Sequence, residues 1–85
     1  QVIMKVPVTR QFFENSTPEQ LNATLEVLEA FCEFRGVSDA EVDLAGEMIT
    51  NICGALEVHE SVNGGLEPRE ALNAFSAKVM GSIDR

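Results

Sequence analysis

The residues that could take part in chemistry are few, and the first to consider is the single histidine, His59. It stands close to Glu57 and Glu60, a combination that can suggest a metal site. On a helix, however, Glu57 points away from His59, and Glu60 is its direct neighbour instead of lying one turn away. We interpret His59 as an exposed side chain near a helix C-terminus, where the helix dipole favours positive charge. We therefore predict no metal site.

Carboxylates and thiols give no catalytic arrangement either. Asp39, Asp43 and Glu47 recur every four residues and share one side of a helix. Paired carboxylates act as acid and base when a pocket separates their pKa values, but this stripe lies at a helix start and is interpreted as a solvated face. Cys32 and Cys53 stand at apolar-face positions, so we expect buried free thiols, with an interhelical disulfide as the alternative. We predict no catalytic residue and no cofactor.

The charge balance limits the partners. The chain has 85 residues with fourteen acidic and six basic side chains, a net charge of −8, and between Gln11 and Pro68 its only basic residue is Arg35. Such a surface repels phosphate backbones and anionic membranes, so we expect neither direct nucleic-acid nor membrane binding. A solubilising role is the simplest account of the acidity, and a basic protein partner is the alternative. With no signal peptide and no apolar run near the roughly 18 residues of a membrane span, we expect a cytoplasmic location.

Apolar periodicity predicts an all-α fold in a single domain covering residues 1–85. Three helices are expected, over residues 17–35, 38–61 and 67–84, each with an apolar stripe at helical spacing. Residues 1–15 are predicted to form an extended N-terminal arm, because Pro7 lacks the N–H that a central strand needs. Within this arm, one helical turn over Thr9 to Asn15 is the alternative to an extended chain. The expected domain is therefore three helices plus an arm.

The helix boundaries carry their own signals. Ser16 or Thr17 can cap the first helix, with Pro18 at its first position and Glu19 or Gln20 completing a capping box. The second helix begins in the same way, since Ser38 precedes Glu41 by three residues. Gly36 stands where a left-handed residue ends the first helix. Asn63-Gly64-Gly65 predicts the turn before the last helix.

One pattern on the second helix favours close packing. Gly46, Thr50 and Gly54 follow one another at four-residue spacing, and small side chains flank them. Each glycine costs a helix interior about 1 kcal/mol relative to alanine, so close approach of another helix is the natural compensation. The approaching helix belongs either to the same chain or to a second copy in a twofold dimer. The predicted interface comprises Gly46, Met48, Ile49, Thr50, Cys53 and Gly54.

Residues 42–52, which read V-D-L-A-G-E-M-I-T-N-I, resemble the central helix of the YejL-type family of small bacterial proteins. The last helix has a similar alanine-rich pattern, in Ala71, Ala74, Phe75 and Ala77, before Ser82-Ile83. The resemblance implies an all-helical fold and a dimer. It places Gly46, Met48, Thr50 and Asn51 near the shared surface. That family has no known biochemical role, so the resemblance implies no function.

Two functional hypotheses follow from the sequence. The first is a non-catalytic helical protein-interaction module that forms a homodimer. The alternative is an acidic inhibitor whose carboxylates imitate a nucleic-acid backbone and bind a basic, nucleic-acid-binding protein. The first depends on helix packing, and the second depends on how the fourteen acidic side chains are distributed over the surface.

Overall fold

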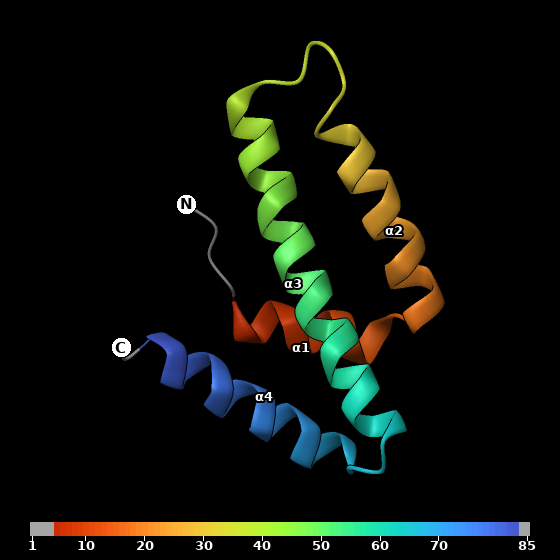
Figure 1. Ribbon diagram of the computed structural model, residues 1–85, viewed down its shortest axis with the longest axis vertical. Coiled ribbons are helices and arrows are strands. Elements are labelled where there is room, and N and C mark those ends of the chain that lie inside the picture. The colour runs from red at the N-terminus through yellow and green to blue at the C-terminus, as the bar shows by residue number, and fades with distance from the viewer. Residues whose placement is uncertain (1–4, 84–85) are drawn as a thin grey trace.

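A computed structural model describes residues 5–83 and contains, within that range, four α-helices and no strand. They are α1 (Val6–Asn15), α2 (Pro18–Phe31), α3 (Asp39–Asn63) and α4 (Pro68–Ile83) (Figure 1). The all-α prediction is confirmed, whereas the expected number of three helices is wrong. Over the same residues, none of the helices has the length and hydrophobicity of a membrane-spanning segment.

The additional helix is α1, which occupies most of the predicted arm. Pro7 lies in its first turn, where the missing N–H costs no helical hydrogen bond. Lys5 precedes the helix without a side-chain cap of its own. Its backbone N–H instead donates to Oδ1 of Asn51, 2.9 Å away on α3. The cap therefore comes from a residue 46 positions later in the chain. Residues 1–4 of the predicted arm lie outside the described residues.

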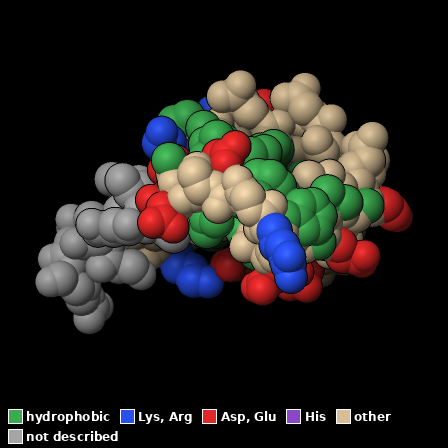
Figure 2. All heavy atoms as spheres, turned by 90° about the horizontal axis from the view of Figure 1, so that it is seen from above, with side chains coloured by type: hydrophobic (Ala, Val, Ile, Leu, Met, Phe, Trp, Pro, Cys, Tyr) green, Lys and Arg blue, Asp and Glu red, His purple; other side chains and the backbone are tan. Residues whose placement is uncertain are grey.

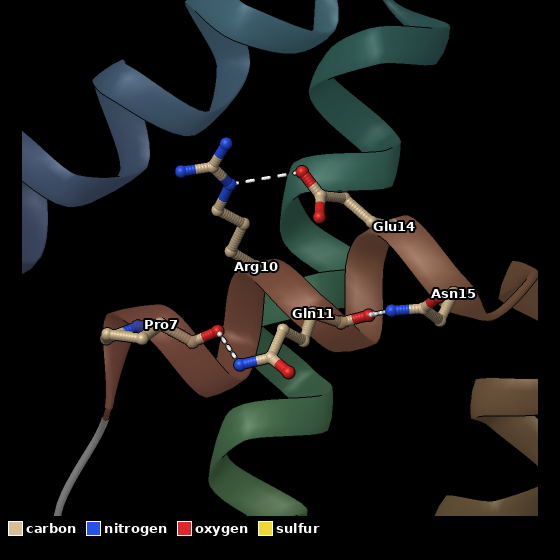
Figure 3. A network of polar contacts seen from close by, with 5 residues as sticks. All are labelled: Pro7, Arg10, Gln11, Glu14 and Asn15. Atoms are coloured by element: carbon tan, nitrogen blue, oxygen red, sulfur yellow. Dashed lines mark hydrogen bonds and ion pairs between the residues drawn. The ribbon is translucent and has the colours of Figure 1, made fainter.

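The outer face of α1 satisfies its polar groups within the helix (Figure 3). Arg10 Nε donates to Glu14 Oε2 at 3.0 Å. The Gln11 side-chain amide donates to the Pro7 carbonyl, and the Asn15 amide donates to the Gln11 carbonyl. These bonds join residues four apart, as neighbours on a helix surface do. They support α1 locally and leave its other face for packing.

Both predicted capping boxes are present. The Thr17 hydroxyl accepts from the Gln20 N–H, and the Gln20 side chain accepts from the Thr17 N–H. Ser38 and Glu41 make the same reciprocal pair at the start of α3. The backbone N–H and then the hydroxyl of Ser38 lower the pKa of the Glu41 carboxyl, because both donate to its charged form.

The end of α2 differs from its prediction. The helix stops at Phe31, four residues before the expected end at residue 35, and the chain continues through turns. Gly36 does adopt a left-handed conformation, with φ of 85°, but it lies in the loop and not directly at the helix end. In the later turn, Gly65 has φ of 119°. Both glycines therefore mark loops correctly, but α2 ends before the loop that contains Gly36.

α3 is the central element, and the other helices pack around it. α2 and α3 form an antiparallel hairpin, α1 crosses α3, and α4 returns across its C-terminal part (Figure 1). Cα atoms span 43 × 32 × 16 Å with a radius of gyration of 13.7 Å. A compact chain of 85 residues has a radius of about 12 Å. The molecule is thus a flat slab, about two helices thick.

The core lies where α3 meets its neighbours. One cluster joins α2 to α3 through Leu21, Ile52 and Ala55, and a second joins α3 to α4 through Val58, Ala71 and Phe75. Phe13 of α1 packs against both clusters. All of these contacts lie along the second half of α3, so the first half of this helix receives less cover.

Candidate protein-interaction surface

A buried polar junction determines where α1 sits on α3. Asn51 Oδ1 accepts hydrogen bonds from the Lys5 backbone N–H at 2.9 Å and from the Thr9 hydroxyl at 3.0 Å. Its Nδ2 donates to the Glu47 carbonyl at 3.0 Å. Thr9 and Asn51 are 0% and 3% exposed. Since a buried polar group without a partner is costly, this junction fixes the crossing point of α1 at the middle of α3.

An apolar groove opens on the part of the hairpin that α1 does not cover. We call it the α2–α3 groove; its volume is about 340 Å³. It is lined by Val27, Leu28, Phe31, Glu41, Leu44, Ala45 and Met48. Val27 and Leu44 remain 66% and 60% exposed. Figure 2, a view onto the loop end of the hairpin, shows hydrophobic side chains at the surface with acidic groups around them.

Phe34, just beyond the end of α2, contacts Phe31 of the α2–α3 groove. Its ring meets Phe31 edge-on with 6.1 Å between the centroids, yet 58% of the residue stays exposed. Large exposed hydrophobic groups that adjoin one another are typical of protein-interaction sites, whereas single ones are ordinary. Val27 and Leu44 meet this criterion because they line one groove, and Phe34 adjoins it through its contact with Phe31.

The exposed side of α2 beside the groove carries no charge. Its residues recur at the three- and four-residue spacing of a helix-pairing face and cover about a third of the circumference. We call this the uncharged face; it comprises Gln20, Ala23, Thr24, Val27 and Ala30, all exposed. Glu29 points to the other side of α2, whereas Glu26 borders the uncharged face next to Ala30. The spacing of these uncharged residues is visible in the sequence, but the sequence-based prediction places all apolar residues of α2 in a single core stripe.

The hairpin as a whole is strongly acidic. Residues 18–63 contain ten acidic side chains, and Arg35 is the only Lys or Arg among them. Glu41 is the one charged residue among those that line the groove, and it is engaged with Ser38. The acidic groups therefore surround the apolar surface and leave its centre uncharged.

The six residues of the predicted interface do not share one surface. Gly54 is buried, Gly46, Ile49 and Thr50 are half-buried, and Cys53 is exposed. Met48 lines the α2–α3 groove. Residues eight apart on an α-helix differ by about 80° in direction, because each residue turns about 100°. Gly54 is therefore turned by less than a quarter of the circumference from Gly46, whereas Met48 is turned by about 200° and lies on the opposite side of α3.

His59 has a structural position that the sequence did not indicate. We predicted an exposed side chain, but it is half-buried, with its ring centroid 4.5 Å from that of Phe13. Its Nε2 lies 3.1 Å from the Ser16 carbonyl oxygen, 43 residues away in the chain. His59 thus joins α3 to the turn between α1 and α2, a contact that helix periodicity cannot reveal.

The remaining chemical candidates stay apart. Cys32 is half-buried and Cys53 is exposed, so the predicted burial of Cys53 is wrong; both are free thiols. Of the predicted carboxylate stripe, Asp39 and Asp43 are exposed, as a solvated face requires, whereas Glu47 is half-buried. Among residues 5–83, no three His, Cys, Asp or Glu side chains come together as a metal-binding group.

A second groove, of about 630 Å³, lies between α1 and α4. Val6, Phe13 and Leu72 form its apolar part, and Arg10, Glu14 and Arg69 are among its polar residues. Arg10 and Glu14 are paired at 3.0 Å, so much of the local charge is neutralised. The two grooves therefore differ in character, and the α2–α3 groove is the more apolar.

Comparison with known proteins adds a family. The model of a family of unknown function (DUF6952) matches residues 4–84. No curated protein and no solved structure matches the chain. None of these findings links the chain to the YejL-type family, and that resemblance remains a prediction. Since the match covers nearly the whole sequence, the chain belongs to this family of unknown function.

Proposed function

We propose that this protein is a non-catalytic interaction module that self-associates through the α2–α3 groove and the uncharged face. The observation that carries the proposal is the exposure of Val27 and Leu44 in one groove, with the exposed Phe34 ring against Phe31 of the same groove. Burying such groups removes apolar surface from water at about 25 cal/mol per Å². A second copy offers the same surface, as a twofold interface requires.

The limited core supports the same proposal. Both clusters of buried apolar side chains lie along the second half of α3, while in the first half only the small Ala45 is buried and the helix borders an open groove. Small domains bury a modest share of their surface, and association is one way in which they gain core. Pairing two hairpins would create a four-helix bundle whose interior contains the groove residues of both copies.

Sedimentation equilibrium over a range of protein concentrations tests this proposal. We expect a monomer–dimer equilibrium, and Leu44→Glu should raise the dimer dissociation constant at least about tenfold, because each dimer would bury two new carboxylates. Leu66→Glu is the matched control, since Leu66 is an exposed leucine, 43% accessible, in the turn before α4. A wild-type protein that stays monomeric at every concentration would contradict the proposal.

The acidic hairpin supports a second candidate function, the inhibitor that imitates a nucleic-acid backbone. Ten acidic residues against Arg35 over residues 18–63 would attract a basic partner. This interaction would weaken as salt rises, whereas apolar self-association between two acidic chains would strengthen. The opposite salt dependences therefore distinguish self-association from the binding of a basic partner. The cytoplasmic location is also part of the proposal, and two free cysteines support it.

A further inference from the structure

We infer that the groove between α1 and α4, which we call the α1–α4 groove, binds a small organic anion that has one carboxylate and an apolar body. This second site goes beyond the proposed self-association, which uses the α2–α3 groove. The volume of the α1–α4 groove is about 630 Å³, within the range of roughly 300–1,000 Å³ that is typical of small-molecule sites. Its lining combines apolar side chains with a few polar groups, as in such sites.

The α1–α4 groove lies in the part of the chain that has a positive net charge. Residues 5–15 and 68–83 contain four basic and two acidic side chains, a net charge of +2, whereas residues 18–63 contain ten acidic side chains and Arg35 alone. Arg10 and Arg69 line the groove, and Glu14 is the one acidic side chain among the described residues that line it. Two positive charges and one negative charge leave +1, so the groove complements a singly charged anion.

Both arginines have donors available for a carboxylate. The Arg69 side chain is exposed and, within residues 5–83, makes no hydrogen bond or ion pair. Arg10 donates to Glu14 through Nε, and its two end nitrogens turn away from Glu14 on the side where α4 lies (Figure 3). A guanidinium has five N–H donors and can hold a carboxylate through two parallel hydrogen bonds. A carboxylate can therefore bind in the groove without displacing Glu14.

Apolar side chains provide a surface for the rest of the ligand. Val6 and Phe13 of α1 and Leu72 of α4 line the groove, and each is half-buried. Covering their exposed parts with an apolar group removes surface from water, at about 25 cal/mol per Å². A carboxylate without an apolar body leaves this surface in water, and an apolar molecule without a carboxylate leaves Arg69 unpaired. The best ligand therefore has both parts.

The α2–α3 groove does not offer the same combination. Glu41 is the one charged side chain among the described residues that line it. An incoming carboxylate would meet a like charge there, which is unfavourable. The sign of the charge thus directs an apolar carboxylate to the α1–α4 groove.

An NMR titration of the full chain with octanoate tests this inference through backbone amide chemical shifts. We expect saturable shifts centred on Phe13, Leu72 and Asn73, with a dissociation constant of about 1 mM or lower. Octanol has the same chain without the charge and should bind at least about tenfold more weakly. Acetate has the charge without the chain and should not saturate in the same range. Octanoate shifts that do not saturate, or that centre on Val27 and Leu44, would overturn the inference.

Charge variants provide matched controls. Arg69→Gln should weaken octanoate binding about tenfold and leave octanol binding unchanged. Arg35→Gln removes the same charge outside the groove and should leave both affinities unchanged. Glu14→Gln should strengthen octanoate binding several-fold, because a like charge is removed from the groove, and loss of structure cannot produce this gain. Arg69 is exposed without a partner and Glu14 belongs to a surface pair, so both variants should keep the wild-type circular dichroism.

The outcomes also separate this inference from the proposed function. Equal losses of octanoate affinity in Arg69→Gln and Arg35→Gln would show that net charge and not the groove attracts the anion, and would overturn the inference. Equal affinities of the wild type for octanoate and octanol would do the same. A chain that stays monomeric in sedimentation but binds octanoate through Arg69 would contradict the proposed self-association and support this site, because one chain supplies all of its residues.

Discussion

The two halves of α3 carry similar apolar side chains, but they have different surroundings. From Asn51 onward, Ile52, Ala55 and Val58 are buried by α1, α2 and α4. Before Asn51, Leu44 and Met48 line a groove that α2 bounds on one side only. The difference shows that the placement of α1 decides which part of α3 becomes core and which part becomes a candidate docking surface.

The strongest way to sharpen this comparison is to truncate one apolar residue in each half. Ile52→Ala removes a fully buried side chain, at 0% exposure, and should lower the free energy of unfolding by about 2–5 kcal/mol. Leu44→Ala should change it by no more than about 0.5 kcal/mol, because most of this side chain is already in water. Urea denaturation at low protein concentration gives both values. Similar losses in the two variants would mean that the halves are equally covered.

The next prediction concerns the junction that separates the halves. Asn51→Ala should reduce stability by about 1–3 kcal/mol, because the Lys5 N–H and the Thr9 hydroxyl lose a common acceptor. Hydrogen exchange should then quicken first in α1. Thr50→Ala is the neighbouring control: its hydroxyl donates only to the Gly46 carbonyl of the same helix, and the expected loss is smaller. Unchanged hydrogen exchange in α1 would show that this junction does not hold α1 against α3.

The smallest effect is expected at the exposed start of α3, where Ser38 and Glu41 form the capping box. Hydrogen bonds from Ser38 lower the pKa of Glu41 below its ordinary value of 4.5. A lowered pKa in the folded state stabilises the protein above pH 4.5, and this contribution disappears as pH falls through the lowered value. Ser38→Ala should move the pKa partway back toward 4.5, because the backbone N–H of residue 38 still donates. NMR titration of the Glu41 carboxyl chemical shift measures this pKa. A value in Ser38→Ala equal to that of the wild type would show that the hydroxyl contributes nothing.

The sequence was most informative where a structure depends on adjacent residues. Thr17 with Gln20 and Ser38 with Glu41 specify their helix starts within four residues, and both were recognised. The turn at Gly65 was recognised for the same reason, since its positive φ requires glycine. The all-helical class followed from apolar periodicity alone.

The features that were missed depend on distant residues. α1 begins without a side-chain cap of its own, and its first free N–H is satisfied by Asn51. Pro7 was read as a sign of extended chain, because nothing nearby indicated a helix start. The position of His59 depends on Ser16 and Phe13 in the same way. The uncharged face on α2 was not singled out either, because burial and not spacing distinguishes the two sides of that helix, and the interface predicted on α3 stays a prediction.

The radial arrangement of the fold has a consequence for its unfolding. α1, α2 and α4 each pack chiefly against α3. Any of these three peripheral helices can therefore detach while the other two keep their principal contacts. Melting of α3 releases all of them together, so the cooperativity of the whole chain resides in one 25-residue helix.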